Sequence, residues 1–378
     1  MTIRGIVANF FMRICSVLPL QDKIVFSCFY GNTFGDNPEV IFKEIRKKHL
    51  PVRCIWLMSN NDVEIEGADV VSVDSFSALY HLSTAKLWID NSRKKDWVFK
   101  RKNQYYVQTW HGDVCLKKIE RDAIESIDSV YIKYAQHDSK MADLMLSGST
   151  FRTGLYEKSF WYSGEILEYG TPKSVVFYEN PEIYKRKVRD YFSIDADVRI
   201  AIYCPTFRAT DDLNLYNIDY ERLIYNLEQE TRCRWVVLVR LHPKINTMQG
   251  QLEYSERVLN ASNYVSVDEL IIASDLVITD YSGCMFSGLE ANKPVLLYAV
   301  DVENYMQTDR GFYFDINALP FPLAQGNDEL EQLIKNFDSD KYKIAAEAFK
   351  DKIGFKTNVK TTEKVVQYIL NKTWKGVI

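Results

Sequence analysis

The chain has 378 residues, of which 47% are hydrophobic and 26% charged, a composition typical of a globular protein with a full core. Its length favours two domains of similar size, and its formal net charge of -4 excludes nucleic-acid binding by bulk electrostatics. The seven cysteines are scattered without metal-site spacing, which favours a reduced, cytosolic protein over a disulfide scaffold.

The first stretch, 1–20, carries apolar residues at helical spacing together with Arg4 and Arg13. This pattern predicts an amphipathic helix on a membrane surface, and a helix packed on the neighbouring domain explains it equally well. The stretch is short for a membrane-spanning helix and Arg13 interrupts it.

Strand and helix signals then alternate, which is typical of a doubly wound α/β fold. The strands predicted in the first half are 23–29, 53–58, 70–73, 86–90, a strand beginning at 105, and 130–135. We expect an N-terminal Rossmann-like domain over 21–185 and a C-terminal one over 186–378. The last helix is a candidate to pack back on the N-terminal domain.

The stretch 271–296 reads strand, polar turn, helix, strand. Leu276–Thr279 is the first strand, and Ser282 is the predicted N-cap of the helix that follows. Such a turn presents backbone N–H groups at a helix N-terminus, an arrangement that suits a phosphate or diphosphate. Asp280 stands where a catalytic or ribose-binding carboxylate would stand, and a capping role is the simpler interpretation.

A histidine follows the strand that begins at Tyr105, in the sequence Trp110-His111-Gly112. A histidine at the carboxyl end of a parallel strand is well placed for proton transfer, although a single histidine is more often structural.

Basic residues also follow two strands of the second half: Arg208 after one, and Arg240 with His242 after the other. Because the carboxyl ends of parallel strands share one edge, we expect these groups beside the Ser282 turn.

Signals for metal and nucleophile chemistry are weak. Asp195-Ala196-Asp197 precedes a strand instead of following one, so we interpret it as a loop and predict no metal site. The sequence has no P-loop, HExxH or GxSxG motif. Basic groups and helix ends therefore have to stabilise any leaving diphosphate.

Four motifs, in this order and spacing, resemble the CDP-glycerol glycerophosphotransferase family of wall teichoic acid and related capsule synthesis. They are Trp110-His111-Gly112, Pro205-Thr206-Phe207-Arg208, Arg240-Leu241-His242-Pro243 and Ile278-Thr279-Asp280-Tyr281-Ser282. The resemblance covers about 23–370. It implies a GT-B-like fold, with two Rossmann-like domains facing across a cleft. It also implies metal-independent transfer of glycerol phosphate, or a related polyol phosphate, from a CDP-activated donor to a hydroxyl, releasing CMP.

The resemblance also implies roles for single residues. His111 would be the general base, His242 would stabilise the donor phosphates, and Asp280 would support the turn or a histidine. The remaining donor-binding residues would be Thr206, Arg208, Arg240, Ser282, Gly283 and, at the cytidine ribose, Glu290. The acceptor side would comprise Trp110, Gly112, Asp113 and Lys117.

The implied partners are a CDP-polyol donor, an undecaprenyl-diphosphate-linked glycan acceptor and the membrane surface, with no cofactor. The enzyme would be cytoplasmic, on the inner face of the cell membrane. The chain departs from the family at Asp113, where Thr is usual, at Gly283, where Ser is usual, and in the turn 170–175.

Two other functions stay open: a GT-B glycosyltransferase using a nucleotide sugar, and a non-catalytic ligand-binding protein of wall assembly. The sequence leaves undecided the polyol, the acceptor, teichoic acid versus capsule, primase versus polymerase, and the oligomeric state.

Overall fold

The computed structural model describes residues 2–60, 62–208, 213–216, 218–241, 254–308 and 310–374. The chain forms two compact units. Unit 1 comprises Met1–Asp113, Ile119–Val175 and Lys356–Ile378, and unit 2 comprises Val114–Lys118 and Val176–Phe355. The predicted boundary at 185 falls inside a helix of unit 2, and the last helix of the chain belongs to unit 1.

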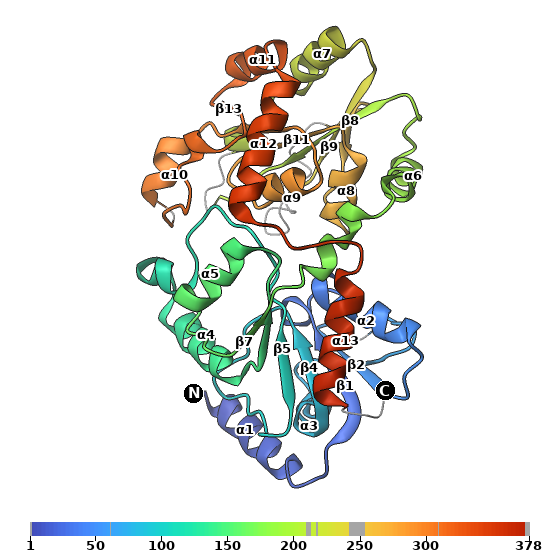
Figure 1. Ribbon diagram of the computed structural model, residues 1–378, viewed down its shortest axis with the longest axis vertical. Coiled ribbons are helices and arrows are strands. Elements are labelled where there is room, and N and C mark those ends of the chain that lie inside the picture. The colour runs from blue at the N-terminus through green and yellow to red at the C-terminus, as the bar shows by residue number, and fades with distance from the viewer. Residues whose placement is uncertain are drawn as a thin grey trace. The chain divides into compact units, whose positions relative to one another are not determined.

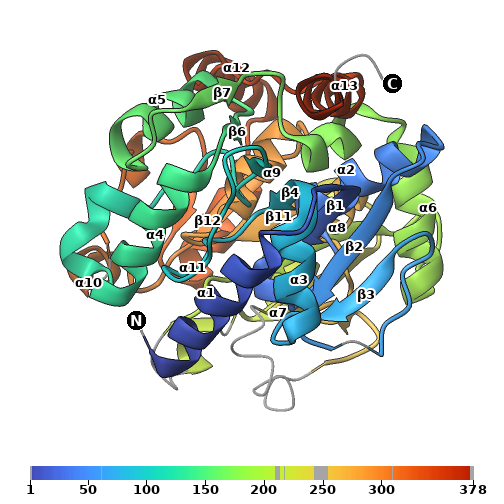
Figure 2. The ribbon, with the colours of Figure 1, turned by 90° about the horizontal axis from the view of Figure 1, so that it is seen from below.

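Unit 1 is built on a seven-stranded sheet in the order β3-β2-β1-β4-β5-β6-β7, in which every pairing is parallel (Figure 1 and Figure 2). Its strands are β1 Gln21–Ser27, β2 Arg53–Met58, β3 Asp69–Ser72, β4 Ala85–Asp90, β5 Tyr105–Gln108, β6 Leu144–Leu146 and β7 Glu165–Leu167. Its α-helices are α1 Ile3–Cys15, α2 Asp36–Lys47, α3 Phe76–Thr84, α4 Ser129–Met141, α5 Thr150–Ser159 and α13 Thr361–Thr373.

Unit 2 repeats this plan with a six-stranded parallel sheet in the order β10-β9-β8-β11-β12-β13. Its strands are β8 Arg199–Cys204, β9 Trp235–Val239, β10 Val258–Asn260, β11 Leu276–Thr279, β12 Val295–Tyr298 and β13 Leu323–Ala324. Its α-helices are α6 Pro181–Phe192, α7 Tyr220–Thr231, α8 Val267–Ala273, α9 Cys284–Glu290, α10 Val302–Thr308, α11 Asn327–Lys335 and α12 Ser339–Ile353.

Both sheets follow the doubly wound order, in which the strand sequence reverses direction between two central strands. These strands are β1 and β4 in unit 1, and β8 and β11 in unit 2. In open α/β sheets the carboxyl ends of the strands on either side of this switch point form the usual ligand site. The fold therefore marks two positions where ligands are expected, one in each unit.

Helix α13 lies beside α2 and completes the core of unit 1 (Figure 1). Its buried apolar side chains repeat at helical spacing, at Val365, Val366, Ile369 and Leu370. The Trp374 indole N–H donates to Asp22 Oδ1 at 2.7 Å and fixes the end of the helix to β1. The last helix thus packs on the sheet formed by the first half of the chain.

Helix α1 has two apolar faces. Ala8, Met12 and Cys15 are buried, and Phe11 packs edge-on against Phe76 of α3 with 4.9 Å between ring centroids. A second set of apolar side chains on the same stretch is exposed: Ile3, Ile6, Val7, Phe10, Ile14, Val17 and Leu18. Among the described residues, no helix combines the length and the apolar character needed to cross a bilayer.

One predicted element is wrong. The stretch 130–135, expected to be a strand, lies in α4. The Asp128 side chain accepts hydrogen bonds from the N–H groups of Val130 and Tyr131 and caps that helix. This N-cap outweighs the strand propensity of the Val-Tyr-Ile sequence.

Candidate active site

In unit 1, the turn after β5 carries the predicted base. Trp110 adopts a left-handed backbone conformation, with φ of 56°. Its N–H donates to Gln108 Oε1 at 2.9 Å, and its carbonyl accepts from Asn37 Nδ2 at 3.1 Å. A non-glycine residue with positive φ persists only where its surroundings hold it. Several hydrogen bonds therefore fix the backbone immediately before His111.

The His111 ring is oriented by its neighbours. Its Nδ1 lies 3.1 Å from the carbonyl oxygen of Asn91. A carbonyl can only accept, so Nδ1 carries the hydrogen, and the neutral ring keeps its lone pair on Nε2. The Trp110 indole stacks on the ring with 4.5 Å between centroids, and Phe29 lies at 5.4 Å. This is the tautomer that a general base acting through Nε2 requires.

The surroundings also favour the neutral form of His111. Burial within dense protein lowers its pKa below the usual 6.5, although the Asn91 carbonyl and the Asp36 carboxylate favour the charged ring. Lys173, which forms an ion pair with Asp36 at 3.1 Å and donates to the His111 carbonyl, adds to the decrease. Protein surrounds the side of the ring that faces Asn91, while part of the residue stays exposed to solvent. The lowered pKa favours the neutral imidazole near pH 7, and the exposed part of the residue can be reached by a hydroxyl.

A buried ionic cluster of Arg93, Glu120 and Asp138 packs against the turn that carries Trp110 and His111. The Arg93 guanidinium donates to Glu120 and Asp138, each at 3.0 Å, and all three side chains are at most 1% exposed. It also lies 5.1 Å from the centre of the Trp110 ring. The two ion pairs hold the guanidinium in place, so it forms a fixed packing surface for the indole that stacks on His111.

Asp113 supports a neighbouring loop. Its Oδ1 accepts from the Gly148 N–H at 2.8 Å, and its backbone carbonyl accepts from Arg152 Nε at 2.7 Å. Burial raises the pKa of the carboxyl. Gly112, in contrast, leaves open space, since a Cβ built there would meet no atom within 4 Å. Of the predicted acceptor side, unit 1 thus contains Trp110, Gly112 and Asp113.

Lys117 does not belong to the N-terminal domain, as the predicted range 21–185 required, because the short segment 114–118 is part of unit 2. Lys117 forms an antiparallel bridge with Phe312, and the Lys118 N–H donates to the Gly311 carbonyl at 2.7 Å. Its ammonium also contacts the Tyr305 hydroxyl. These contacts place Lys117 beside Tyr305, whose ring also faces the Arg208 guanidinium in unit 2.

In unit 2, Asp280 joins the loops that follow the two switch-point strands. Its carboxylate accepts from the Thr206 N–H at 2.8 Å, the Thr206 hydroxyl at 2.6 Å and the Tyr281 N–H at 2.6 Å. Thr206 follows β8 and Asp280 follows β11. The carboxylate thereby holds the loop after β8 to the turn after β11.

Arg208 is held between two aspartates. Its Nη1 donates to Asp280 Oδ2 at 2.7 Å, and its Nε and Nη2 donate to the two carboxylate oxygens of Asp301 at 2.9 and 3.0 Å. The rings of Tyr281 and Tyr305 lie 4.8 and 4.9 Å from the guanidinium carbon. The side chain is 5% exposed. Arg208 is thus at the predicted site, but its charge is offset within the protein.

Asp301 was not among the predicted site residues. It lies three residues after the end of β12, at the sheet edge where Thr206 and Asp280 also lie. The position of Asp301 after a buried strand was a signal that the sequence offered. The pairing of Asp301 with Arg208, 93 residues away along the chain, left no such signal. Asn91 and Asn37 were missed for the same reason, because their hydrogen bonds to the His111 turn connect distant loops.

The turn at the start of α9 is open. The predicted N-cap is wrong by one residue, because Gly283 occupies that position and makes no side-chain cap. The Ser282 hydroxyl still accepts from the Cys284 N–H at 3.3 Å. Gly283 is exposed, and a Cβ built on it would meet nothing within 4 Å. The N–H groups of Met285 and Phe286 donate within this turn to the carbonyls of Ser282 and Gly283, at 3.2 and 3.0 Å, so an anion would approach the exposed backbone at Gly283 itself.

Glu290, the predicted ribose-binding residue, lies at the end of α9 beside a cavity of about 290 Å³ in unit 2. Tyr178, Lys350 and Phe355 are among the other lining residues. The Tyr178 hydroxyl donates to Glu290 Oε1 at 3.3 Å. A buried carboxylate in a cavity with an aromatic wall can accept hydrogen bonds from ribose hydroxyls.

Arg240 and His242 are the other basic residues that we predicted at this site. Arg240 follows β9, and its guanidinium donates to the carbonyls of Ala261, at 3.2 Å, and Tyr264. His242 lies outside the described residues. Across the described parts of the chain, no cluster of three or more His, Cys, Asp or Glu side chains is arranged to hold a metal ion.

Comparison with known proteins identifies the family and the relatives that this chain resembles. Its sequence matches the family model described as CDP-Glycerol:Poly(glycerophosphate) glycerophosphotransferase over residues 10–371. It is 27% identical to the teichoic acid poly(glycerol phosphate) polymerase of Bacillus spizizenii, covering 95% of this chain and 94% of that one. It is 28% identical to the teichoic acid glycerol-phosphate transferase of Staphylococcus aureus, covering 94% of this chain and 95% of that one.

Two further comparisons concern length and fold. The chain spans about half the length, 49%, of other curated relatives, the poly(glycerol phosphate) polymerases of Staphylococcus epidermidis and Bacillus subtilis. The solved structure of the wall teichoic acid polymerase TagF superposes with a TM-score of 0.83 at 27% identity, over 98% of this chain and 95% of that one.

The predicted family and α/β fold class are confirmed. The chain belongs to the CDP-glycerol:poly(glycerophosphate) glycerophosphotransferase family.

Proposed function

We propose that this chain transfers glycerol phosphate, or a related polyol phosphate, from its CDP-activated form to a hydroxyl of a lipid-linked acceptor and releases CMP. The family match supports the donor. The observation that carries the proposal is the His111 ring, whose Nδ1–H donates to the Asn91 carbonyl so that Nε2 is left as a base. A neutral imidazole in this tautomer suits deprotonation of an alcohol near pH 7.

The proposed reaction is a displacement at phosphorus. His111 Nε2 takes the proton of the acceptor hydroxyl as the acceptor oxygen forms a bond to the phosphorus that carries the polyol. The bond from that phosphorus to the bridging diphosphate oxygen breaks, and its electron pair leaves with CMP. The product is a phosphodiester, and positioning with charge stabilisation supplies most of the catalysis in such reactions.

The leaving CMP is assigned to unit 2. The open turn at Ser282 and Gly283 supplies backbone N–H groups, and Glu290 binds the ribose in its cavity. Arg208 acts by holding the two site loops together, because its charge is offset by Asp280 and Asp301. The positive charge for CMP is then assigned to Arg240 and His242. The reaction is proposed to need no metal and no cofactor.

The acceptor is proposed to be an undecaprenyl-diphosphate-linked glycan at the cytoplasmic face of the membrane, in teichoic acid or capsule synthesis. The exposed apolar face of α1 supports this location, because such a face buries favourably at a bilayer surface. Co-sedimentation with anionic liposomes tests it. Replacing Ile6 and Phe10 by Glu should abolish sedimentation, and undiminished sedimentation of that variant would remove α1 from the membrane contact.

The reaction itself is tested by offering CDP-glycerol and CDP-ribitol separately, each with a lipid-linked disaccharide. Nucleotide release is followed by chromatography and the product by mass spectrometry. The proposal requires CMP together with an acceptor heavier by polyol phosphate units, and the preferred donor identifies the polyol. Release of CDP, or of CMP without any change in acceptor mass, would contradict the transfer.

A further inference from the structure

Unit 1 contains a cavity whose lining includes none of the predicted site residues that the structure describes. Its volume is about 540 Å³, within the ~300–1,000 Å³ typical of small-molecule sites. Ser27, the last residue of β1, and Asp90, the last residue of β4, both line it. These strands flank the point at which the strand order reverses, so the cavity occupies the position where doubly wound sheets bind their ligands.

One part of this cavity is apolar. Val7 and Ala8 of α1 and Phe76 and Leu79 of α3 contribute to its lining, together with Val98. Val7 is 50% exposed and Phe76 58% exposed, so the apolar lining continues onto the surface. There it joins the exposed apolar face of α1 described above. An aliphatic chain could pass from an apolar phase into the cavity without crossing water.

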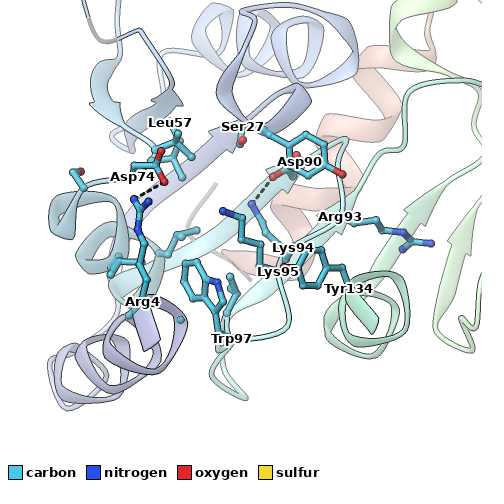
Figure 3. A pocket seen from close by; sticks show the side chains of 18 of the residues that line it. Arg4, Ser27, Leu57, Asp74, Asp90, Arg93, Lys94, Lys95, Trp97 and Tyr134 are labelled. Atoms are coloured by element: carbon cyan, nitrogen blue, oxygen red, sulfur yellow. Dashed lines mark hydrogen bonds and ion pairs between the residues drawn. The ribbon is translucent and has the colours of Figure 1, made fainter. Parts of the chain in front are cut away.

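The other part is polar and has an excess of positive charge. Lys94 pairs with Asp90, and Arg4 pairs with Asp74 at 2.9 Å, as Figure 3 shows. Lys95 reaches the same space, and within the described part of the chain it has no carboxylate partner. Its ammonium lies 6.0 Å from the Trp97 ring centre.

Arg93 adds no available charge, because Glu120 and Asp138 hold its guanidinium. The lining thus combines an apolar wall with one uncompensated cation, which fits an anionic head group carrying an aliphatic chain.

The polar part adjoins the residues that hold His111. Tyr30, which lines the cavity, follows Phe29, whose ring lies 5.4 Å from that of His111. Asp90 precedes Asn91, whose carbonyl accepts from His111 Nδ1 at 3.1 Å. A head group bound at this end would place the groups attached beyond it next to the base.

We propose that this cavity is the acceptor subsite. It takes the aliphatic chain and the anionic phosphate head of an amphiphile, so that the hydroxyl-bearing part extends toward His111. The role of the ligand as acceptor rests on the proposed function, whereas its binding does not. The cavity assignment is therefore testable without turnover.

Binding is measured by titration calorimetry with hexyl, octyl and decyl phosphate below their micellar concentrations, and with inorganic phosphate and decanol as single-feature probes. Burying each further methylene should strengthen alkyl phosphate binding about three- to fourfold. Decyl phosphate should bind more tightly than either inorganic phosphate or decanol. Affinity that is independent of chain length, or inorganic phosphate binding as tightly as decyl phosphate, would overturn the proposal.

Two matched pairs of variants place the binding in the cavity. Val7→Trp should fill the apolar part and weaken decyl phosphate binding at least tenfold, whereas Val359→Trp, at a similarly exposed valine of unit 1 outside the cavity, should not. Lys95→Glu should weaken alkyl phosphate binding up to about fivefold and leave decanol unaffected. Lys102→Glu, exposed and outside the cavity, should change neither. Equal effects within each pair would refute the assignment.

The two proposals fail separately. If the wild-type chain released no CMP with any acceptor, the proposed function would fail, while chain-length-dependent binding could still be measured. If Val7→Trp retained full CMP release with a lipid-linked acceptor, the cavity assignment alone would fail. Thermal unfolding confirms that each variant is folded, and Lys95→Glu, an exposed change, keeps the cavity testable even if Val7→Trp destabilises α1.

Discussion

Arg208→Met removes a guanidinium that the structure holds between two carboxylates. Methionine keeps much of the side-chain length and the contacts with the tyrosine rings, but it cannot donate a hydrogen bond. Asp280 is then left 1% exposed and Asp301 10% exposed, both without their cation. If Arg208 acted only by binding donor, the substitution would affect affinity and leave stability nearly unchanged.

The structure predicts a large loss of stability instead. Removing one partner of a buried ion pair typically lowers the free energy of unfolding by about 3–5 kcal/mol, because charge remains buried and unpaired. Two carboxylates are affected here, so we expect a value in the upper half of that range. Urea denaturation followed by far-ultraviolet circular dichroism measures it.

The pH dependence of this loss follows from Asp301. Burial by itself raises the pKa of its carboxyl, but hydrogen bonding and charge from Arg208, with a hydrogen bond from Tyr281, outweigh burial and hold the pKa below its usual value. A carboxyl with a lowered folded-state pKa stabilises the fold above its unfolded-state pKa, and this stabilisation is lost as the pH falls. In Arg208→Met, the hydrogen bond from Tyr281 remains but the contributions of Arg208 are lost, so burial is opposed less and protonation of the carboxyl becomes more favourable.

The difference in free energy of unfolding between wild type and Arg208→Met should therefore be largest near pH 7, and it should become smaller below a pH of about 5. Arg222→Met is the control, because its ion pairs with Asp328 and Glu331 are partly exposed and should contribute little. A loss below about 1 kcal/mol for Arg208→Met, or a loss that does not change with pH, would refute the reasoning and return Arg208 to direct donor binding.

Three further measurements, one on the wild-type chain and two on variants, test the site. The acidic limb of the kcat/KM profile should have its midpoint below pH 6.5, because burial lowers the pKa of His111 and only the neutral ring acts as base; a midpoint above 6.5 would be inconsistent with this. Gly283→Ser should leave folding and CMP release intact, since the added side chain meets open space, and a marked fall in thermal stability would show that the turn is closed. Glu290→Gln should weaken CMP binding roughly 10–100-fold in calorimetry, as expected for a hydrogen bond to a charged group, whereas the exposed control Glu347→Gln should bind normally; equal affinity for both would exclude Glu290 from the nucleotide.

Local sequence patterns were sufficient for much of the fold. The apolar run 276–279, the turn after it and the strand 295–298 are all present as β11, the start of α9 and β12. They were predictable because a strand buried on both faces needs uninterrupted apolar residues. The stretch 130–135 was misread because β-branched and aromatic residues favour strands, while the capping carboxylate of Asp128 decides for a helix.

The site residues were predictable as positions at strand ends, but their interactions were not. The position of Arg208 after β8 was visible in the sequence. Its bidentate pairing with Asp301 depends on how β8 and β12 are placed in the sheet. Lys117 was assigned to the wrong unit for a similar reason, since the chain leaves unit 1 for only five residues at 114–118 and then returns. Contacts of this kind come from tertiary structure and leave no local pattern.

The most direct test of the central claim is the initial rate of CMP release from CDP-glycerol, in the presence of acceptor, by the wild-type chain and His111→Ala. Removing a general base should lower the rate on the order of 10²–10⁴-fold, with the thermal unfolding temperature unchanged. His49→Asn, an exposed histidine elsewhere in unit 1, should retain the wild-type rate. A near wild-type rate for folded His111→Ala would contradict the account.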